Sequence, residues 1–152
     1  MNKGESADLI MKLYDLRREP TMREARNWFV TFMPESAEEV VNAVIDEKTS
    51  PYYRMVLGYW DMAASFVIHG AIDEEMFNDA NGEHIMVFCK IEPYLEELRK
   101  TFKFPKMLAN LETLIMNMPD AKALLAERRE MIQGWVKART AQGLGMKDKN
   151  EG

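Results

Sequence analysis

The sequence contains one cysteine and two histidines, and this scarcity excludes several kinds of site. Cys89 has no partner for an intramolecular disulfide, and zinc or iron–sulfur sites that need two or more thiolates cannot form. Neither His69 nor His84 has a glutamate three residues before it, so the Glu-x-x-His pairs of carboxylate-bridged di-iron bundles are missing. We therefore expect no metal site and no cofactor, and we interpret Cys89 as a small thiol in the core.

The motifs of several common enzyme classes are also absent. The chain has no glycine-rich phosphate loop, no Gly-x-Ser-x-Gly elbow and no His-Glu-x-x-His zinc motif. Residues 79–83 have the spacing of part of a calcium loop, but its first and twelfth ligand positions would be occupied by Phe77 and Phe88. From these absences we predict no catalytic residue, and we favour a protein that is not an enzyme.

Long uninterrupted apolar runs are lacking too. The longest mostly apolar stretch, residues 55–72, contains Asp61 and His69, and an aspartate near the centre of a membrane span costs about 3 kcal/mol. The first residues lack the apolar region of a secretory signal. We therefore expect a cytoplasmic protein with no membrane partner.

The chain also lacks a surplus of basic over acidic residues. Twenty Lys and Arg residues stand against 25 Asp and Glu residues, which gives a net charge of −5. This balance disfavours nucleic acid as a partner. Residues 99–106 do interleave basic and aromatic side chains, as some single-strand binders do, but three nearby glutamates dilute the positive charge.

What the chain does have is helical periodicity along nearly its whole length, and we find no convincing alternation of apolar and polar residues. Its 152 residues fit one domain of ordinary size. We predict an all-α, compact single-domain bundle of about six to eight helices with short connections and one long central helix. The domain covers residues 1–140, and the glycine-rich residues 141–152 are expected to form a mobile tail.

Local signals give the expected helix boundaries. Pro93 should kink a helix of residues 83–102 without ending it, and further helices should begin at residues 104–105 and 119–120. The remaining starts and stops are a cap at Ser6, a capping box at Ser36–Glu39, a long helix from Ser50-Pro51 to a stop at Gly70, and a cap at Asp73.

The long helix of residues 50–69 carries a polar stripe. Arg54, Asp61, Ser65 and His69 follow one another at helical spacing, together with Gly58, within a sector of about 80° on an otherwise apolar helix. In one interpretation the stripe lines a ligand cleft, with Arg54 as an anion anchor and Asp61 and His69 as hydrogen-bonding or acid/base groups. In the other it is a thin exposed face or an internal hydrogen-bond network.

A second feature concerns association. Trp28, Phe29, Phe32 and Met33 are more large apolar residues than a short helix easily buries in a monomer, which favours a homo-oligomer, a dimer first, or another protein partner. Our primary interpretation is a non-catalytic interaction or self-associating module. The alternative is a binder of a small anionic or amphipathic ligand, or an enzyme, that uses the polar stripe.

Part of the sequence resembles a known group of proteins. Residues 59–77, with residues 14–19 and the pair Trp28-Phe29 upstream, are similar to small helical bacterial proteins of unknown function. The resemblance covers roughly residues 6–135. It implies a bacterial cytosolic origin and assigns no catalytic or ligand-binding residue.

Overall fold

The computed structural model describes residues 2–143, and this part of the chain consists of helices and the connections between them, without a strand. The all-helical class is thus confirmed. The helices are α1 Lys3–Arg17, α2 Pro20–Thr31, α3 Ala37–Ile45, α4 Ser50–Ile68, α5 Glu74–Ala80, α6 Glu83–Ile91, the 3-10 helix η1 Glu92–Tyr94, α7 Leu95–Thr101, α8 Ala109–Met116 and α9 Ala121–Ala141.

The helix expected over residues 83–102 is interrupted rather than kinked. Pro93 lies in η1, between α6 and α7, because proline has no amide N–H to donate and its ring clashes with the preceding turn. Counted as one interrupted helix, these three elements leave eight helical segments in the described residues, within the predicted range. No helix in this part of the chain is both long and apolar enough to cross a bilayer.

The helix caps are partly those that the sequence predicts. The Glu39 amide donates to Ser36 Oγ at 3.2 Å, and Asp73 caps α5 in the same way. Ser6 is not a cap: it is buried inside α1, and its hydroxyl accepts a hydrogen bond from the Asp73 amide at 3.0 Å. Asn2 caps α1 instead, so α1 begins earlier than expected and Ser6 ties it to the start of α5.

The last two helices begin later than predicted. Lys103 (φ 54°) and Leu108 (φ 55°) adopt the left-handed conformation, so the chain turns twice between residues 102 and 109 before α8 starts. Asp120 (φ 52°) produces a similar turn before α9. Gly70 (φ 81°) ends α4 as predicted. Of the expected tail, residues 144–152 lie outside the described residues.

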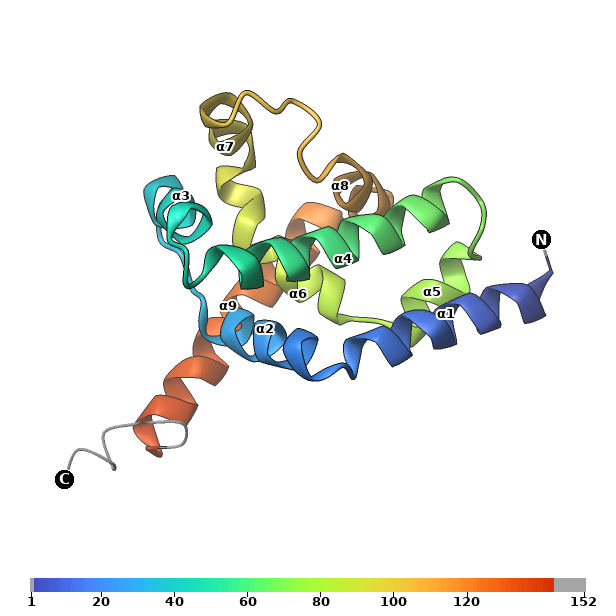
Figure 1. Ribbon diagram of the computed structural model, residues 1–152, viewed down its shortest axis with the longest axis horizontal. Helices are drawn as coiled ribbons and strands as arrows, with labels where there is room; N and C mark the ends of the chain where they lie inside the picture. The colour runs from blue at the N-terminus through green and yellow to red at the C-terminus, as the bar shows by residue number, and fades with distance from the viewer. Residues whose placement is uncertain (1, 144–152) are drawn as a thin grey trace.

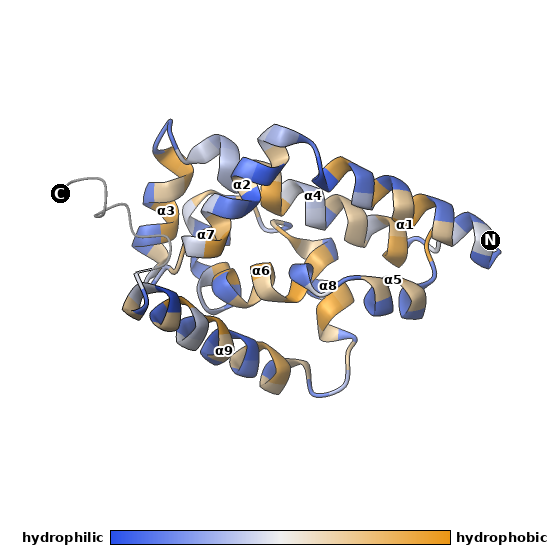
Figure 2. Ribbon diagram, turned by 90° about the horizontal axis from the view of Figure 1, so that it is seen from below, coloured by the Kyte–Doolittle hydropathy of each residue, from blue (hydrophilic) through white to orange (hydrophobic). Residues whose placement is uncertain are grey.

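The helices are arranged around α4 and α6. α4 packs against α2 on one side and α8 on the other, and it ends near α5 (Figure 1). It is one of two long helices, α9 being longer, and part of it faces solvent, so a single enclosed central helix is not evident. α6 lies between α9 and the layer that contains α1, α2 and α4 (Figure 2).

The aromatic residues of α2 and of its C-cap, Phe32, are packed against α4 rather than exposed. Phe29 is buried, while Trp28 and Phe32 are half-buried and stack with their ring centroids 4.8 Å apart. Tyr53 of α4 closes the cluster with an edge-on contact to Phe32. We predicted association because these side chains should exceed what a short helix can bury in a monomer. That reason is wrong, because they are packed within the chain.

Candidate functional site

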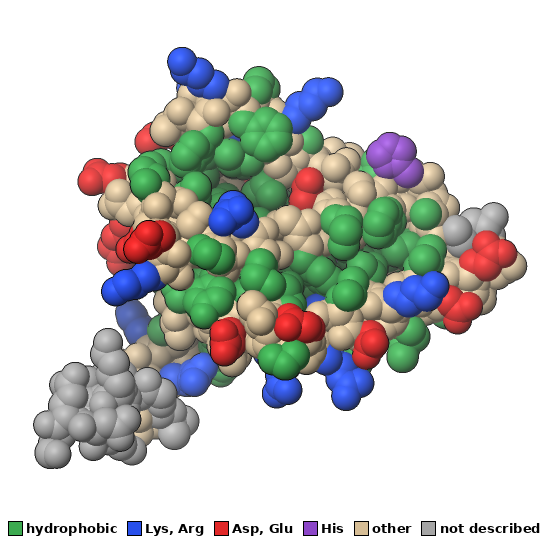
Figure 3. Space-filling view, viewed as in Figure 1, with side chains coloured by type: hydrophobic (Ala, Val, Ile, Leu, Met, Phe, Trp, Pro, Cys, Tyr) green, Lys and Arg blue, Asp and Glu red, His purple; other side chains and the backbone are tan. Residues whose placement is uncertain are grey.

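The polar stripe of α4 lies along an outer face of the molecule. Arg54 and His69 are exposed, and Ser65 is half-buried. Hydrophobic side chains gather on the face that contains α4, with charged groups around them (Figure 3). The stripe residues bond mainly within their own helix: the Arg54 Nε donates to Ser50 Oγ at 3.2 Å, and Ser65 Oγ donates to the Met62 carbonyl at 2.6 Å.

Asp61 is the one member of the stripe that bonds to another helix. Its carboxylate accepts a hydrogen bond of 2.9 Å from the amide of Leu111, in the first turn of α8. No side chain of α8 or of its preceding turn caps this helix, so Asp61 supplies the missing acceptor from α4. No member of the stripe lines any of the three best-formed cavities in the described part of the chain, and its role as a ligand site stays a prediction.

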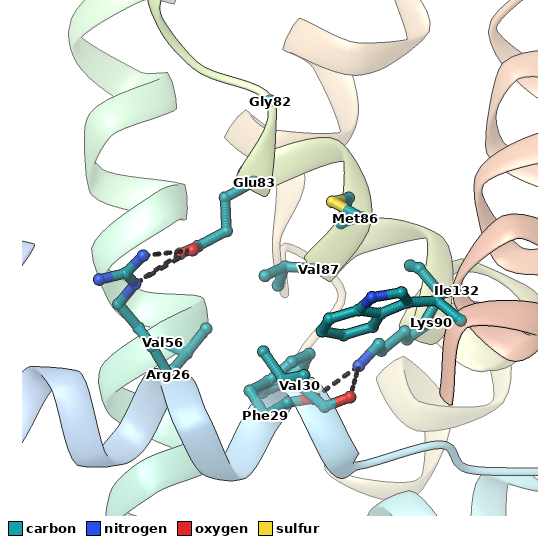
Figure 4. A pocket seen from close by; sticks show the side chains of 11 residues that line it. Arg26, Phe29, Val30, Val56, Gly82, Glu83, Met86, Val87, Lys90 and Ile132 are labelled. Atoms are coloured by element: carbon teal, nitrogen blue, oxygen red, sulfur yellow. Dashed lines mark hydrogen bonds and ion pairs between the residues drawn. The ribbon is translucent and has the colours of Figure 1, made fainter. Parts of the chain in front are cut away.

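The best-formed cavity lies elsewhere, where α2, α4, α6 and α9 meet. Its volume is about 330 Å³. The apolar walls come from Phe29 and Val30 of α2, Val56 of α4, Val87 of α6, and two α9 residues (Figure 4). The α9 residues are Ile132, which is buried, and Trp135, which is 49% exposed. Small-molecule sites of proteins begin at about this size and are lined in this way.

Lys90 is the polar group at one end of this cavity. The residue is only 6% exposed, and its amine reaches from α6 to the end of α2, where it donates to the carbonyls of Phe29 at 2.6 Å and Val30 at 3.1 Å (Figure 4). These carbonyls belong to the last turn of α2, where the helix dipole is negative, and the Phe29 carbonyl also accepts from the Phe32 amide at 3.1 Å. Burial nevertheless lowers the pKa of Lys90 to about 8.

A charged pair occupies the opposite end of the cavity. Arg26 of α2 donates to both carboxylate oxygens of Glu83, the closest contact being 2.8 Å (Figure 4). The Trp60 indole donates to the same carboxylate at 3.0 Å. Glu83, the first residue of α6, therefore joins α2, α4 and α6, and its hydrogen bond to Arg26 raises the pKa of that guanidinium.

His84 follows Glu83 and is fully buried, with 0% exposure. Its imidazole packs against the rings of both Trp60 (centroids 5.5 Å apart) and Phe77 (5.2 Å), and neither nitrogen has a hydrogen-bond partner among the described residues. Burial lowers the pKa of His84 to about 4, so the ring is neutral near pH 7.

Cys89 is a core thiol, as the sequence analysis expects. It is buried, its Sγ donates to the Met86 carbonyl, and burial raises its pKa to about 11, so it is not a reactive thiolate. Among the described residues, no group of three or more His, Cys, Asp or Glu side chains is placed to hold a metal ion.

Lys90, Arg26 and Glu83 are not among the site residues predicted from the sequence. One signal was available: between Glu83 and Glu92, Lys90 is the single charged residue in an otherwise apolar stretch of α6. A charge in such a place has to find partners in the interior. The pairing of Arg26 with Glu83 spans 57 residues and leaves no local trace in the sequence.

Comparison with known proteins places the chain without assigning it an activity. Residues 4–118 match a family described as a domain of unknown function, DUF4760. No curated protein and no solved structure matches. The matched segment ends before α9, so Ile132 and Trp135, which close the cavity, lie outside it.

Proposed function

The chain belongs to the DUF4760 family, and we propose that it binds a small amphipathic molecule, with an anionic head group, in the cavity between α2, α4, α6 and α9. The observation that carries this proposal is the buried Lys90 amine at one end of an apolar cavity. The binding role corresponds to the alternative raised by the sequence, at a different place in the fold. A bacterial, cytoplasmic setting is part of the proposal.

The charges of the cavity favour an anion. Arg26 and Glu83 neutralise each other as an ion pair, whereas Lys90 takes part in no salt bridge within residues 2–143. Its two hydrogen bonds go to backbone carbonyls, which leaves the positive charge without a counter-ion. A carboxylate next to the amine would supply that charge, and a hydrocarbon chain would fill the apolar remainder.

The proposal is tested with three ligands that share one hydrocarbon chain: decanoate, decanol and decylamine. Binding is followed by calorimetry and by tryptophan fluorescence, to which Trp135 in the cavity wall contributes along with Trp28 and Trp60. We expect decanoate to bind about tenfold or more tighter than decylamine, with decanol between them, because one charge pair in a partly desolvated site contributes about 1.5–3 kcal/mol.

Two matched variants separate the cavity amine from the general charge of the protein. Lys90→Met should remove the preference for decanoate over decanol, while Lys122→Met, at an exposed position of α9, should preserve it. Equal affinities for decanoate and decylamine in the wild type, or no binding of any of the three, would refute the proposal.

Self-association is a second candidate function, favoured by one observation. Met62 and Phe66 lie one turn apart on α4 and are 39% and 38% exposed, although both are large and apolar. A symmetric dimer, as the sequence analysis favours, could cover this face. Light scattering at micromolar concentration should then give twice the chain mass, and Phe66→Glu should return it to that of a monomer; a monomeric wild type contradicts this function.

A further inference from the structure

The Lys90 amine has one position that its hydrogen bonds leave free. A lysine nitrogen has three substituent positions beyond its carbon, and here two of them face the Phe29 and Val30 carbonyls. The third carries a proton in the ammonium form and a lone pair in the neutral amine. Because Lys90 lines the cavity and α2 takes the other two positions, this third one is the position left for a molecule in the cavity.

The surroundings of Lys90 determine how often that lone pair is present. Its pKa is lowered to about 8 by burial, and the neighbouring Cys89 opposes this shift only in part. Of the elements that line the cavity, α2 and α6 contribute Arg26 and Glu83, paired with each other, while α4 and α9 contribute no titratable group. At pH 8 about half of the Lys90 amines are neutral, against about one in 250 for a lysine in water.

We propose that Lys90 is a reactive amine that forms an imine with an aldehyde carrying an apolar chain. This inference rests on the cavity of the proposed function and adds a covalent activity to it. The same walls that accommodate the chain of a carboxylate accommodate that of an aldehyde, and the carbonyl carbon then takes the place of the carboxylate carbon beside Lys90. A desolvated lysine in an apolar pocket is a recurrent imine-forming nucleophile.

The reaction balances without a further reactant. The nitrogen lone pair attacks the carbonyl carbon, a C–N bond forms, and the carbonyl oxygen takes up the proton that the amine has released. The carbinolamine at this point is protonated on nitrogen, because the carbonyl oxygen has taken up the proton that the ammonium released before the attack. It then loses water as its C–O bond breaks and one N–H proton leaves with the hydroxyl group, which gives a protonated imine. In sum, ammonium and aldehyde yield iminium and water, with no change of oxidation state. The iminium nitrogen keeps one N–H, which can stay with the Phe29 carbonyl.

The test is reductive trapping on the full chain. Limiting decanal is added near pH 8 with cyanoborohydride, which reduces the imine to a stable secondary amine, and peptide mass mapping reports the labelling of every lysine. We expect Lys90 to be labelled about tenfold or more faster than the exposed lysines. Glyceraldehyde, a polar aldehyde without an apolar chain, should show no such preference, and saturating decanoate should slow the labelling of Lys90.

The wild type suffices for this measurement, so the outcome does not depend on whether a Lys90 variant folds. Labelling of Lys90 by decanal at or below the rate of exposed lysines overturns the inference, and decanoate binding, if still present, leaves the proposed function intact. Preferential labelling of Lys90 by decanal with no binding of decanoate has the opposite meaning: the reactive amine stands and the anion-binding function falls.

Discussion

The polar side chains of α6 and those of α4 differ in where the fold places them. Glu83, His84 and Lys90 occur in an apolar stretch without a regular polar period, and all three are turned into the protein. Arg54 and His69 repeat with the period of the helix, and both face outward.

In this protein the regular polar stripe lies mainly at the surface, with Asp61 as its link to another helix, whereas the isolated Lys90 has its partners in the interior. A stripe of helical period can always be turned to water as a whole. An isolated charge such as Lys90 has no such option, and its burial is tolerated only because α2 offers carbonyls to it.

Of the stability changes that distinguish α6 from α4, the largest should come from the protonation of His84. Above pH 6.5 the ring is neutral in both the folded and the unfolded chain and contributes no pH dependence. Below 6.5 the unfolded chain binds a proton that the folded chain does not bind until about pH 4, so the free energy of unfolding falls by about 3 kcal/mol across this window. Urea denaturation of the wild type at pH 7 and pH 4 measures the difference.

His84→Leu isolates this contribution, because the other titrating groups are common to both proteins. The variant should be at least as stable as the wild type at pH 7, since the imidazole nitrogens have no partner to lose, and should depend less on pH below 6.5. An equally steep loss of stability in the variant would show that His84 is not the buried neutral ring described above.

A smaller effect is expected from Glu83. Glu83→Gln removes the charge that Arg26 faces and leaves the guanidinium, about 30% exposed, without its ion pair. We expect the free energy of unfolding to fall by about 2 kcal/mol, measured by urea denaturation at pH 7. The exposed Glu97→Gln is the control and should change it by less than about 0.5 kcal/mol. Equal effects of the two substitutions would remove the distinction between interior and surface glutamates.

The smallest effects should come from the stripe on α4. Asp61→Ala removes the acceptor of the Leu111 amide and should cost about 1 kcal/mol, whereas Arg54→Ala should stay within about 0.5 kcal/mol of the wild type. Thermal melting of both variants against a panel of small anionic metabolites checks this. A metabolite that raises the melting temperature of the wild type alone would show that the stripe is a binding site, and the functional polar residues would then lie on α4 rather than on α6.

The fold could be predicted where a signal is local. The caps at Ser36 and Asp73 and the stop at Gly70 each depend on a few neighbouring residues, and each is confirmed. The start of α8 could not be predicted, because it depends on left-handed conformations at Lys103 and Leu108, residue types that rarely adopt them. Tertiary packing decides such turns.

The candidate site could be predicted less well than the fold. The cavity needs side chains from four helices, and its α9 wall meets α6 only after the chain has folded back through α8. Helical periodicity concerns one helix at a time, so it reveals the stripe on α4 but not the role of Lys90. The apolar neighbours of Lys90 indicate its burial but not the two carbonyls that accept its hydrogen bonds.

The hydrogen bond between Asp61 and the Leu111 amide makes the first turn of α8 depend on α4 for its stability. α8 has eight residues, too few to be helical by themselves in water, and the acceptor for its first turn is 50 residues away on another helix. The Leu111 amide therefore exchanges with solvent deuterium whenever α8 separates from α4, even if the rest of the molecule stays intact. The exchange rate of this one amide proton therefore reports how often α8 separates from α4.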